Sequence, residues 1–312
     1  MSVEARTQLR TAPIVVPTVH SDLVRRQIRL SYWLLLPSLL VVGLVALVPL
    51  VQTIVQSFTN ARLASARPVQ FIGLKNYLDL LTDDAFRHAI WVTVLFTLLT
   101  VTFEFVLGMG IALVVNSNFR GRGPMRAAML VPWAIPTVVS TQIWRWMYHD
   151  IYGVINDLLV DKLHFLPSNV AWIADPATAI PAVAAVDIWK TTPFVALLLL
   201  AGLQLIPGDI YEAANVDGAN PVQAFLWLTL PLLRPAIVVA LIFRTLDALR
   251  VFDAFYVMFG NRADTQPMAI YAQQNIVAFS DLGYGGAISV AIFLIIAVFV
   301  ITYVTIFKVE QS

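Results

Sequence analysis

The chain has 312 residues, of which 59% are hydrophobic and 12% are charged. Soluble proteins carry about 25% charged residues, so this chain has too few to cover the surface of a domain in water. It has 20 basic and 19 acidic residues and no cysteine, which excludes a basic nucleic-acid-binding surface, disulfide bonds and thiol catalysis. An ordinary soluble enzyme is therefore excluded.

Six apolar runs are each long enough to cross the hydrocarbon core of a bilayer, which takes about 20 helical residues. They lie at 32–58, 89–115, 125–148, 179–202, 235–259 and 284–307. The fifth run carries several charges, but Pro235 and Gly260 bracket it as a helix. We predict an all-α integral membrane protein with six transmembrane helices.

The distribution of basic residues favours a cytoplasmic amino terminus. Residues 1–31 include Arg25, Arg26 and Arg29, and the short turn at 116–126 holds three more arginines. The first run is too long for the core of a signal peptide, about 7 to 15 residues, so we expect it to stay in the membrane. We predict cytoplasmic tails at 1–31 and 308–312 and one membrane domain at 32–307.

Signatures of catalysis are missing from the sequence. None of the four lysines, Lys75, Lys162, Lys190 and Lys308, follows a glycine, so a phosphate-binding G-x-x-x-x-G-K-[ST] loop is absent. The four histidines have no H-E-x-x-H or other metal-binding spacing. We therefore expect a protein that is not an enzyme, with no catalytic residue, metal or cofactor of its own.

The segment 203–234, between the fourth and fifth runs, has the pattern of a helical hairpin. Asp209 with Glu212 fits a capping box, and a first helix is predicted to end at Gly218. Asn220 fits the cap of a second helix, with Gln223 at its third position and an end at Pro231. Small apolar residues between these caps indicate a docking surface in the cytoplasm: Ile210, Tyr211, Ala213, Ala214, Val216 and Ala219.

This segment resembles the cytoplasmic signature of permease subunits in binding-protein-dependent ABC importers. The signature reads E-A-A, three residues, G, nine residues, I-x-L-P. The matching residues are Glu212, Ala213, Ala214, Gly218, Leu228, Leu230 and Pro231, with Leu228 in place of isoleucine. Within the family the chain is similar to carbohydrate permeases of the maltose and glycerol-phosphate type, from 71–77 to the sixth run. It departs at 260–262, where such permeases often carry G-G-G-P.

The resemblance implies a type I ABC importer permease in the bacterial cytoplasmic (inner) membrane. The partners it implies are a second, different permease, a dimer of cytoplasmic ATP-binding subunits that hold ATP and Mg, an extracytoplasmic sugar-binding protein and membrane lipid, without nucleic acid. The coupling residues it implies are Glu212, Ala213, Ala214, Asp217, Gly218, Leu230 and Pro231. Glu212 either binds a basic group of the ATPase or serves only its own capping box.

Charged residues inside the predicted spans are functional candidates, because they are costly in a membrane. The fourth span has Asp187 and Lys190, and the fifth has Arg244, Asp247, Arg250 and Asp253 at spacings of three. One interpretation pairs Arg244 with Asp247 and Arg250 with Asp253 as structural ion pairs. The resemblance to the maltose permease instead implies sugar contacts from Asp187, Lys190, Thr191, Phe194, Asp247 and Arg250. Glu104, in the second span, has no evident partner in the sequence and is interpreted as structural.

Two other functional classes remain open on the residues alone. An ion-coupled secondary transporter would relay the ion through Asp187, Lys190 and Asp247. A passive channel or structural subunit would need neither a relay nor a cytoplasmic signature. Because only the importer explains the signature segment, we predict an ATP-driven importer of a sugar, such as the disaccharides trehalose or maltose.

Overall fold

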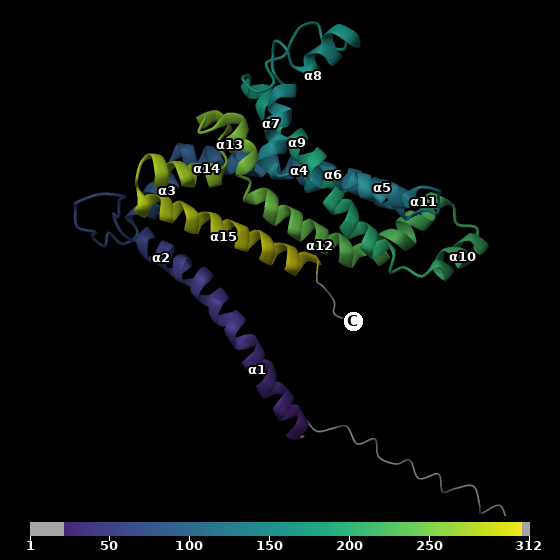
Figure 1. Cartoon of the computed structure of the whole chain (residues 1–312), viewed down its shortest axis with the longest axis horizontal. Coiled ribbons are helices and arrows are strands. Elements are labelled where there is room, and N and C mark those ends of the chain that lie inside the picture. Colours follow the sequence, from purple (N-terminus) through teal and green to yellow (C-terminus); the bar gives the residue numbers. More distant parts are fainter. Residues whose placement is uncertain (1–21, 308–312) are drawn as a thin grey trace, which may run out of the picture. The chain divides into compact units, whose positions relative to one another are not determined.

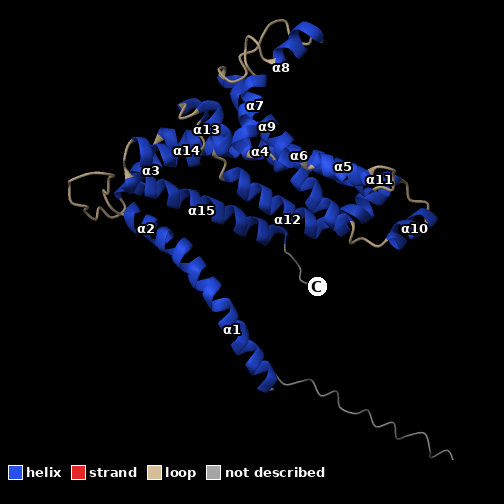
Figure 2. Cartoon of the chain, in the orientation of Figure 1, coloured by secondary structure: helices blue, strands red, loops and turns tan. Residues whose placement is uncertain are grey.

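The computed structural model describes residues 22–307, so most of the predicted amino-terminal tail and the tail at 308–312 lie outside the described residues. Helices and loops make up this part of the chain (Figure 2), with two isolated bridges, Thr59–Phe71 and Arg62–Asp281. The all-α prediction is confirmed. The chain divides into two compact units at residues 1–52 and 53–312.

The first unit is a single apolar helical stretch. It consists of α1 (Asp22–Val42), the π-helical turn η2 (Gly43–Leu47) and the start of α2 (Val48–Ser57). Large side chains such as Trp33, Leu34 and Val45 are about 70% exposed. A helix that is apolar on all sides is stable in lipid rather than in water. The stretch Val24–Ser57 is long enough to cross a membrane, as predicted for 32–58.

The second unit is built around four long helices (Figure 1): α4 (Asp84–Asn116), α9 (Pro176–Leu203), α12 (Leu230–Leu249) and α15 (Leu282–Phe307). Two glycines let α9 approach its neighbours closely. A Cβ atom on Gly108 of α4 would lie 2.9 Å from Val195, and one on Gly202 of α9 would lie 2.4 Å from Ala236 of α12. Small residues at such crossings are typical of membrane helices, which associate by close packing.

Shorter elements connect the long helices. Before α9 they are α3 (Lys75–Thr82), α5 (Arg122–Met129), α6 (Val131–Ala134), α7 (Thr137–Met147), α8 (Val154–Asn156) and the π-helical η3 (Asp157–Lys162). After α9 they are α10 (Gly208–Val216), α11 (Pro221–Ala224), η4 (Phe225–Thr229), α13 (Asp253–Phe259), η5 (Ala263–Thr265), α14 (Met268–Gln273) and η6 (Gln274–Ala278).

Two predicted spans are broken. The stretches Arg122–Ala134 and Thr137–Met147 meet at an angle of 87°, so the predicted helix at 125–148 is a bent pair. The bend lies at Pro136, which lacks an amide hydrogen and keeps Ile135 in an extended conformation. The fifth span is interrupted after Leu249 and resumes as α13. Five described helices are long enough to span a membrane, or six if the bent pair is one span.

The fifth span also begins much earlier than predicted. α11, η4 and α12 follow one another without a gap from Pro221 to Leu249, so the expected helix end at Pro231 is wrong. Pro231 lies in the first turn of α12, directly after the π-helical turn η4. The change of hydrogen-bond register there accommodates a residue without an amide hydrogen.

A carboxylate joins three helices at the start of α4. Asp83 caps α4 by accepting hydrogen bonds from the amides of Ala85 (2.9 Å) and Phe86 (3.3 Å). It also accepts from the hydroxyls of Tyr271 and Tyr284, each at 2.5 Å. Partial burial raises the pKa of Asp83, but the hydrogen bonds from these four donors together lower that pKa below its usual range. Asp83 therefore ties α14 and α15 to the amino end of α4.

Candidate functional site

A polar cavity of about 270 Å³ lies between the broken spans and α9. Five of the six predicted sugar-contacting residues line it: Asp187, Lys190, Thr191, Asp247 and Arg250. Its other lining residues are Trp133, Thr137, Arg244, Ala248, Val251, Phe252, Asp253 and Ala254. The structure thus brings together residues up to 121 positions apart in the sequence, from Trp133 to Ala254.

Arg244 is the centre of a buried charge cluster beside this cavity. It is 3% exposed and donates hydrogen bonds to Glu104 of α4, to Asp187 of α9 and to Asp247 of its own helix, the last at 3.1 Å. Three helices are therefore joined by one guanidinium group. The predicted pair Arg244–Asp247 is confirmed, and Glu104, interpreted from the sequence as structural without a nameable partner, has Arg244 as its partner. An ion pair between two different helices leaves no fixed spacing in the sequence, so these pairs could not be predicted from it.

The other polar side chains of the cavity differ in how many hydrogen bonds they already make with the protein. The hydroxyl of Thr191 lies 2.6 Å from the carbonyl of Asp187 and contacts Glu104, and Lys190 Nζ donates to the carbonyl of Trp133 at 3.2 Å. The carboxylate of Asp247 contacts Arg244, yet its side chain is 70% exposed. Asp247 is therefore available to a solute that enters the cavity.

Phe194 does not line the cavity, although its inclusion among the sugar contacts was predicted. Its ring stacks on that of Trp133, with centroids 5.8 Å apart and an angle of 11° between the planes. Trp133 lines the cavity wall, and Phe194 contacts it through this stacking. The sequence offered no signal for Trp133, because it comes from the bent third span.

The predicted ion pair between Arg250 and Asp253 does not form among the described residues. α12 ends at Leu249, and Asp253 is the first residue of α13, so the two side chains do not share a helical face. Phe252, between them, has φ −137° and ψ −64°, outside helical geometry. Both charges instead line the cavity.

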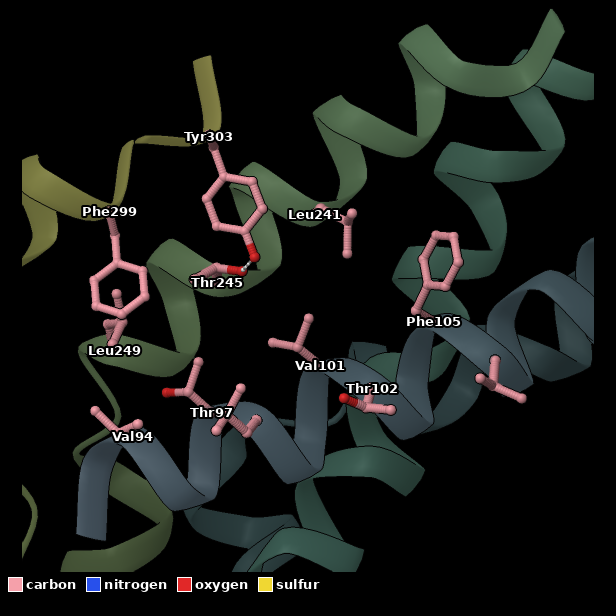
Figure 3. Close-up of a pocket in the computed structure, with 12 residues that line it drawn as sticks. Val94, Thr97, Val101, Thr102, Phe105, Leu241, Thr245, Leu249, Phe299 and Tyr303 are labelled. Carbon is pink, nitrogen blue, oxygen red and sulfur yellow. Dashed lines mark hydrogen bonds between the residues drawn. The ribbon is translucent and has the colours of Figure 1, made fainter. Parts of the chain in front are cut away.

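A second cavity, of about 290 Å³, lies between α4, α12 and α15 (Figure 3). Its wall is mostly aliphatic and aromatic, with hydroxyls from threonines and Tyr303 and without a charged side chain. Thr245 donates to the hydroxyl of Tyr303 at 3.4 Å. A polyhydroxylated or charged solute would lose more hydration here than these few groups replace. The charged cavity is therefore the candidate transport site.

The predicted docking segment forms α10, but it begins differently from the prediction. Pro207 precedes the helix without a side-chain cap, and Asp209 lies within the first turn, so the predicted capping box of Asp209 with Glu212 is wrong. Glu212, Ala213 and Asp217 are exposed, and Ala214 is buried. Among the described residues Glu212 makes neither a hydrogen bond nor a salt bridge, which removes the interpretation that it serves only its own helix.

The turn at Gly218 and the start of the second helix agree with the prediction, although that helix does not end at Pro231. Gly218 has φ +80°, in the region that favours glycine, and it ends the first helix. Asn220 and Gln223 form the predicted capping box, with both hydrogen bonds at 2.9 Å. The hydroxyls of Tyr211 and Thr229 lie 3.0 Å apart and connect α10 to the start of the fifth span. Leu230 and Pro231 follow in the first turn of α12.

The family model described as "Binding-protein-dependent transport system inner membrane component" matches residues 104–309, which include both the charged cavity and α10. The chain belongs to this family. It is therefore a permease subunit of an ABC transporter, a transport component of the inner membrane and not an enzyme. The permease prediction made from Glu212, Gly218 and Pro231 is confirmed.

Known proteins match the permease along most of its length. It is 43% identical to the sulfoquinovosyl glycerol transport system permease protein of Agrobacterium fabrum, over 85% of each chain. It is 41% identical to the trehalose/maltose transport system permease protein of Thermococcus litoralis (91% of this chain and 95% of the relative). It is 37% identical to the trehalose transport system permease protein of Mycobacterium tuberculosis, over 96% of this chain and 94% of the relative.

A solved structure confirms the fold. The crystal structure of a bacterial ABC transporter that imports the acidic polysaccharide alginate contains a chain that superposes with a TM-score of 0.79. The superposition covers 92% of the permease and 98% of that chain, at 22% sequence identity. The predicted fold of an ABC importer permease is therefore confirmed.

Proposed function

We propose that the permease imports a neutral sugar, with trehalose or maltose as the solute, and that the charged cavity binds it. The observation that carries the proposal is the cavity itself, in which residues from three broken or buried spans present opposite charges to one space. The names of two relatives, for trehalose/maltose and trehalose transport, support the choice of solute. An ion-coupled carrier or a channel has no support in a member of this family.

The balance of charge favours a neutral solute. The cavity wall carries three carboxylates, Asp187, Asp247 and Asp253, and three cations, Lys190, Arg244 and Arg250. Glu104 lies behind Arg244 and adds a further negative charge to the cluster. Without an excess of positive charge, the wall gives little attraction to a sulfonated or acidic sugar.

The chemistry of the wall suits a sugar ring. Carboxylates accept hydrogen bonds from pairs of hydroxyls, and the guanidinium of Arg250 donates in a planar fork. The aromatic face of Trp133, held by Phe194, can cover the C–H side of a ring. We assign sugar contacts to Asp187, Lys190, Thr191, Asp247, Arg250 and Trp133.

Coupling to ATP hydrolysis is assigned to α10 and the residues that follow it. Glu212 and Ala213 present an exposed carboxylate and a small side chain, which allow close docking of the helix in a groove of an ATP-binding subunit. Asp217 and Gly218 end that helix, and Leu230 and Pro231 begin α12. ATP and Mg would bind to the partner, so closure of the ATPase pair would move α10 and re-expose the cavity.

The remaining assembly follows from the family. We assign a second, different permease subunit, a dimer of ATP-binding subunits and an extracytoplasmic sugar-binding protein as partners. The arrangement of basic residues supports cytoplasmic termini, with tails at 1–31 and 308–312 flanking a membrane domain at 32–307. The segment 203–234 then lies in the cytoplasm, where an ATPase can reach it.

Uptake by the reconstituted transporter tests this function. The full complex in proteoliposomes, with binding protein outside and ATP inside, should accumulate labelled trehalose or maltose and not a sulfonated sugar. Asp247→Asn removes a charged acceptor, which typically contributes about 1.5 to 3 kcal/mol, so uptake should fall by at least tenfold and unequally between the two disaccharides. Asp161→Asn, an exposed carboxylate outside the cavity, is the matched control.

Two results would contradict the proposal. Uptake that does not require ATP would remove the coupling assignment. An equal loss for both sugars in Asp247→Asn, together with loss of complex assembly, would show that Asp247 is only a packing ion pair with Arg244.

A further inference from the structure

The bend of the third span interrupts the backbone hydrogen bonds of a membrane helix. In a straight helix, the carbonyl of Trp133 would accept the amide hydrogen of Thr137, four residues later. The first helical stretch ends at Ala134, and α7 starts at Thr137 at an angle of 87° to it, so this bond does not form in the described part of the chain. A carbonyl freed in this way is unfavourable in a membrane span unless another donor reaches it.

Lys190 supplies that donor. It lies on α9, which packs against α6 (Figure 1), and it is 8% exposed. Its Nζ donates to the carbonyl of Trp133 at 3.2 Å, whereas it forms no salt bridge within the described residues, although Asp187 lies one turn away on the same helix. The carbonyl of Trp133 is among the last four of the helical stretch Arg122–Ala134, where the helix dipole also favours a cation.

Phe194 contacts the side chain of the same residue. Lys190 and Phe194 are four positions apart on α9, so they lie on one face of the helix, one turn from each other. The ring of Phe194 stacks on the ring of Trp133. One face of α9 therefore contacts Trp133 twice, through its carbonyl and through its ring.

The bend decides where part of the wall of the charged cavity lies. Trp133 lines the cavity from one side of Pro136, and Thr137, the first residue of α7, lines it from the other side. Because the helical hydrogen bonds are interrupted between them, the positions of these two residues depend on what holds the bend from outside. Lys190 and Phe194 are the residues of α9 that contact it at Trp133.

We propose that Lys190 and Phe194 are positioning residues that hold Trp133 at the bend and so set the shape of the cavity wall at Trp133 and Thr137. The proposal rests on the proposed function for the solute, and it gives Lys190 a second role beside the sugar contact assigned to it there. A residue that only contacts the sugar acts when the sugar is bound. A positioning residue acts in the empty cavity as well, and this difference can be measured.

Distances across the bend in the absence of sugar test the proposal. Spin labels on cysteines at Ala128 of α5 and Ile143 of α7, both exposed, report the bend by pulsed electron paramagnetic resonance of the complete complex. The natural chain has no cysteine that would add a signal. Lys190→Met keeps the length of the side chain but removes the donor, so the distance distribution should shift and widen. Lys190→Arg keeps a donor and should restore the original distribution.

A second variant acts through the ring and leaves the charges of the cavity unchanged. Phe194→Leu should shift the distribution in the same direction as Lys190→Met. The double variant should shift it by less than the sum of the two, because both residues act through Trp133.

Two controls separate the bend from other effects. A label pair at Leu98 of α4 and Ala128 does not cross the bend and should keep its distance in every variant. Asp247→Asn removes a proposed sugar contact on α12, away from the bend, and should leave the distribution across the bend unchanged.

Uptake by the same variants distinguishes this proposal from the proposed function. Lys190→Met should lower the uptake of trehalose or maltose about tenfold, the loss expected when a hydrogen bond from a charged group is removed. If the unmodified complex takes up neither sugar, the proposed function fails, while the distances measured without sugar still decide the role of Lys190. If uptake falls in Lys190→Met with an unchanged distribution across the bend, Lys190 is only a sugar contact and the positioning role is wrong. An equal change at the Leu98–Ala128 pair would also overturn it, because it would show a general loss of structure.

Discussion

Arg244 shows how one residue can set the geometry of the charged cavity. It neutralises Glu104 and Asp187, which are almost completely buried and come from two other helices. It also positions Asp247, whose carboxylate faces the cavity. Because the guanidinium group is planar and donates in several directions, lysine could not replace it. Under the proposed function, its main role is therefore to position Asp187 and Asp247 rather than to bind the sugar directly.

Removal of the Arg244 charge should destabilise the packing of α4, α9 and α12 around it. Arg244→Met leaves two buried carboxylates without a partner, which typically costs about 3 to 5 kcal/mol. We expect a lower unfolding temperature of the detergent-solubilised permease and reduced assembly with the ATPase. Arg250→Gln is the matched control, because Arg250 makes no salt bridge among the described residues; it should keep stability and lose transport. Equal stability of the two variants would contradict the central role of Arg244.

Asp83 should make the stability of the permease depend on pH in the acidic range. The pKa of Asp83 in the folded protein lies below the ordinary value of about 3.9. Its contribution to folding stability is therefore fully present above about pH 3.9 and is lost as the pH falls through the pKa of the folded state. Asp83→Asn should reduce stability by about 1.5 kcal/mol at neutral pH, through weaker bonds to Tyr271 and Tyr284. Unfolding temperatures between pH 3 and pH 7 test this, and the difference between the variants should shrink below pH 4. A constant difference would rule out the charge as its cause.

At the level of elements, the position of the end of α10 depends on the turn at Gly218. Gly218→Val places a β-branched side chain at φ +80°, a strain of order 1 to 3 kcal/mol, although no neighbouring atom lies within 4 Å of the added Cβ. We expect lower binding-protein-stimulated ATP hydrolysis for every accepted sugar, because the end of α10 is displaced. Gly218→Asn is the control, since asparagine tolerates this conformation, and it should retain most of the activity. If Gly218→Val hydrolyses ATP normally, the geometry of this turn is not needed for coupling.

The elements also show which parts of the structure can be inferred from sequence. The existence of the long apolar helices, the glycine at 218 and the Asn220–Gln223 box follow local rules, and these were predicted correctly. The bend at Pro136 and the interruption after Leu249 depend on tertiary contacts, so hydropathy showed two continuous spans instead. The partner of Glu104 and the place of Trp133 in the cavity wall were not predicted, for the same reason. Their roles arise from residues on other helices, about 90 to 140 positions away for Glu104.

At the level of the whole molecule, the direction of the chain through the membrane can be measured. Single cysteines at Ser117 and Asn220 should be protected from an impermeant thiol reagent in intact cells, whereas those at Ala66, Ser168 and Asp264 should be labelled. The natural chain has no cysteine, so it provides the blank. Labelling at Asn220 from outside would place α10 on the wrong side for an ATPase.

The continuous helical stretch from Pro221 to Leu249 separates the proposed coupling residues from the proposed solute contacts. It rises about 43 Å, from the residues that follow α10 to the edge of the charged cavity, where Arg250 interrupts it. In the proposed function, one end of this helix follows the segment that docks on the ATP-binding subunit, and the other end borders the bound solute. Substitutions at Asp247 or Arg250 are therefore expected to change the solute preference without altering coupling through Leu230 or Pro231. Exchange of the residues at the cavity end alone would then give a transporter that takes a different solute and keeps the same ATPase.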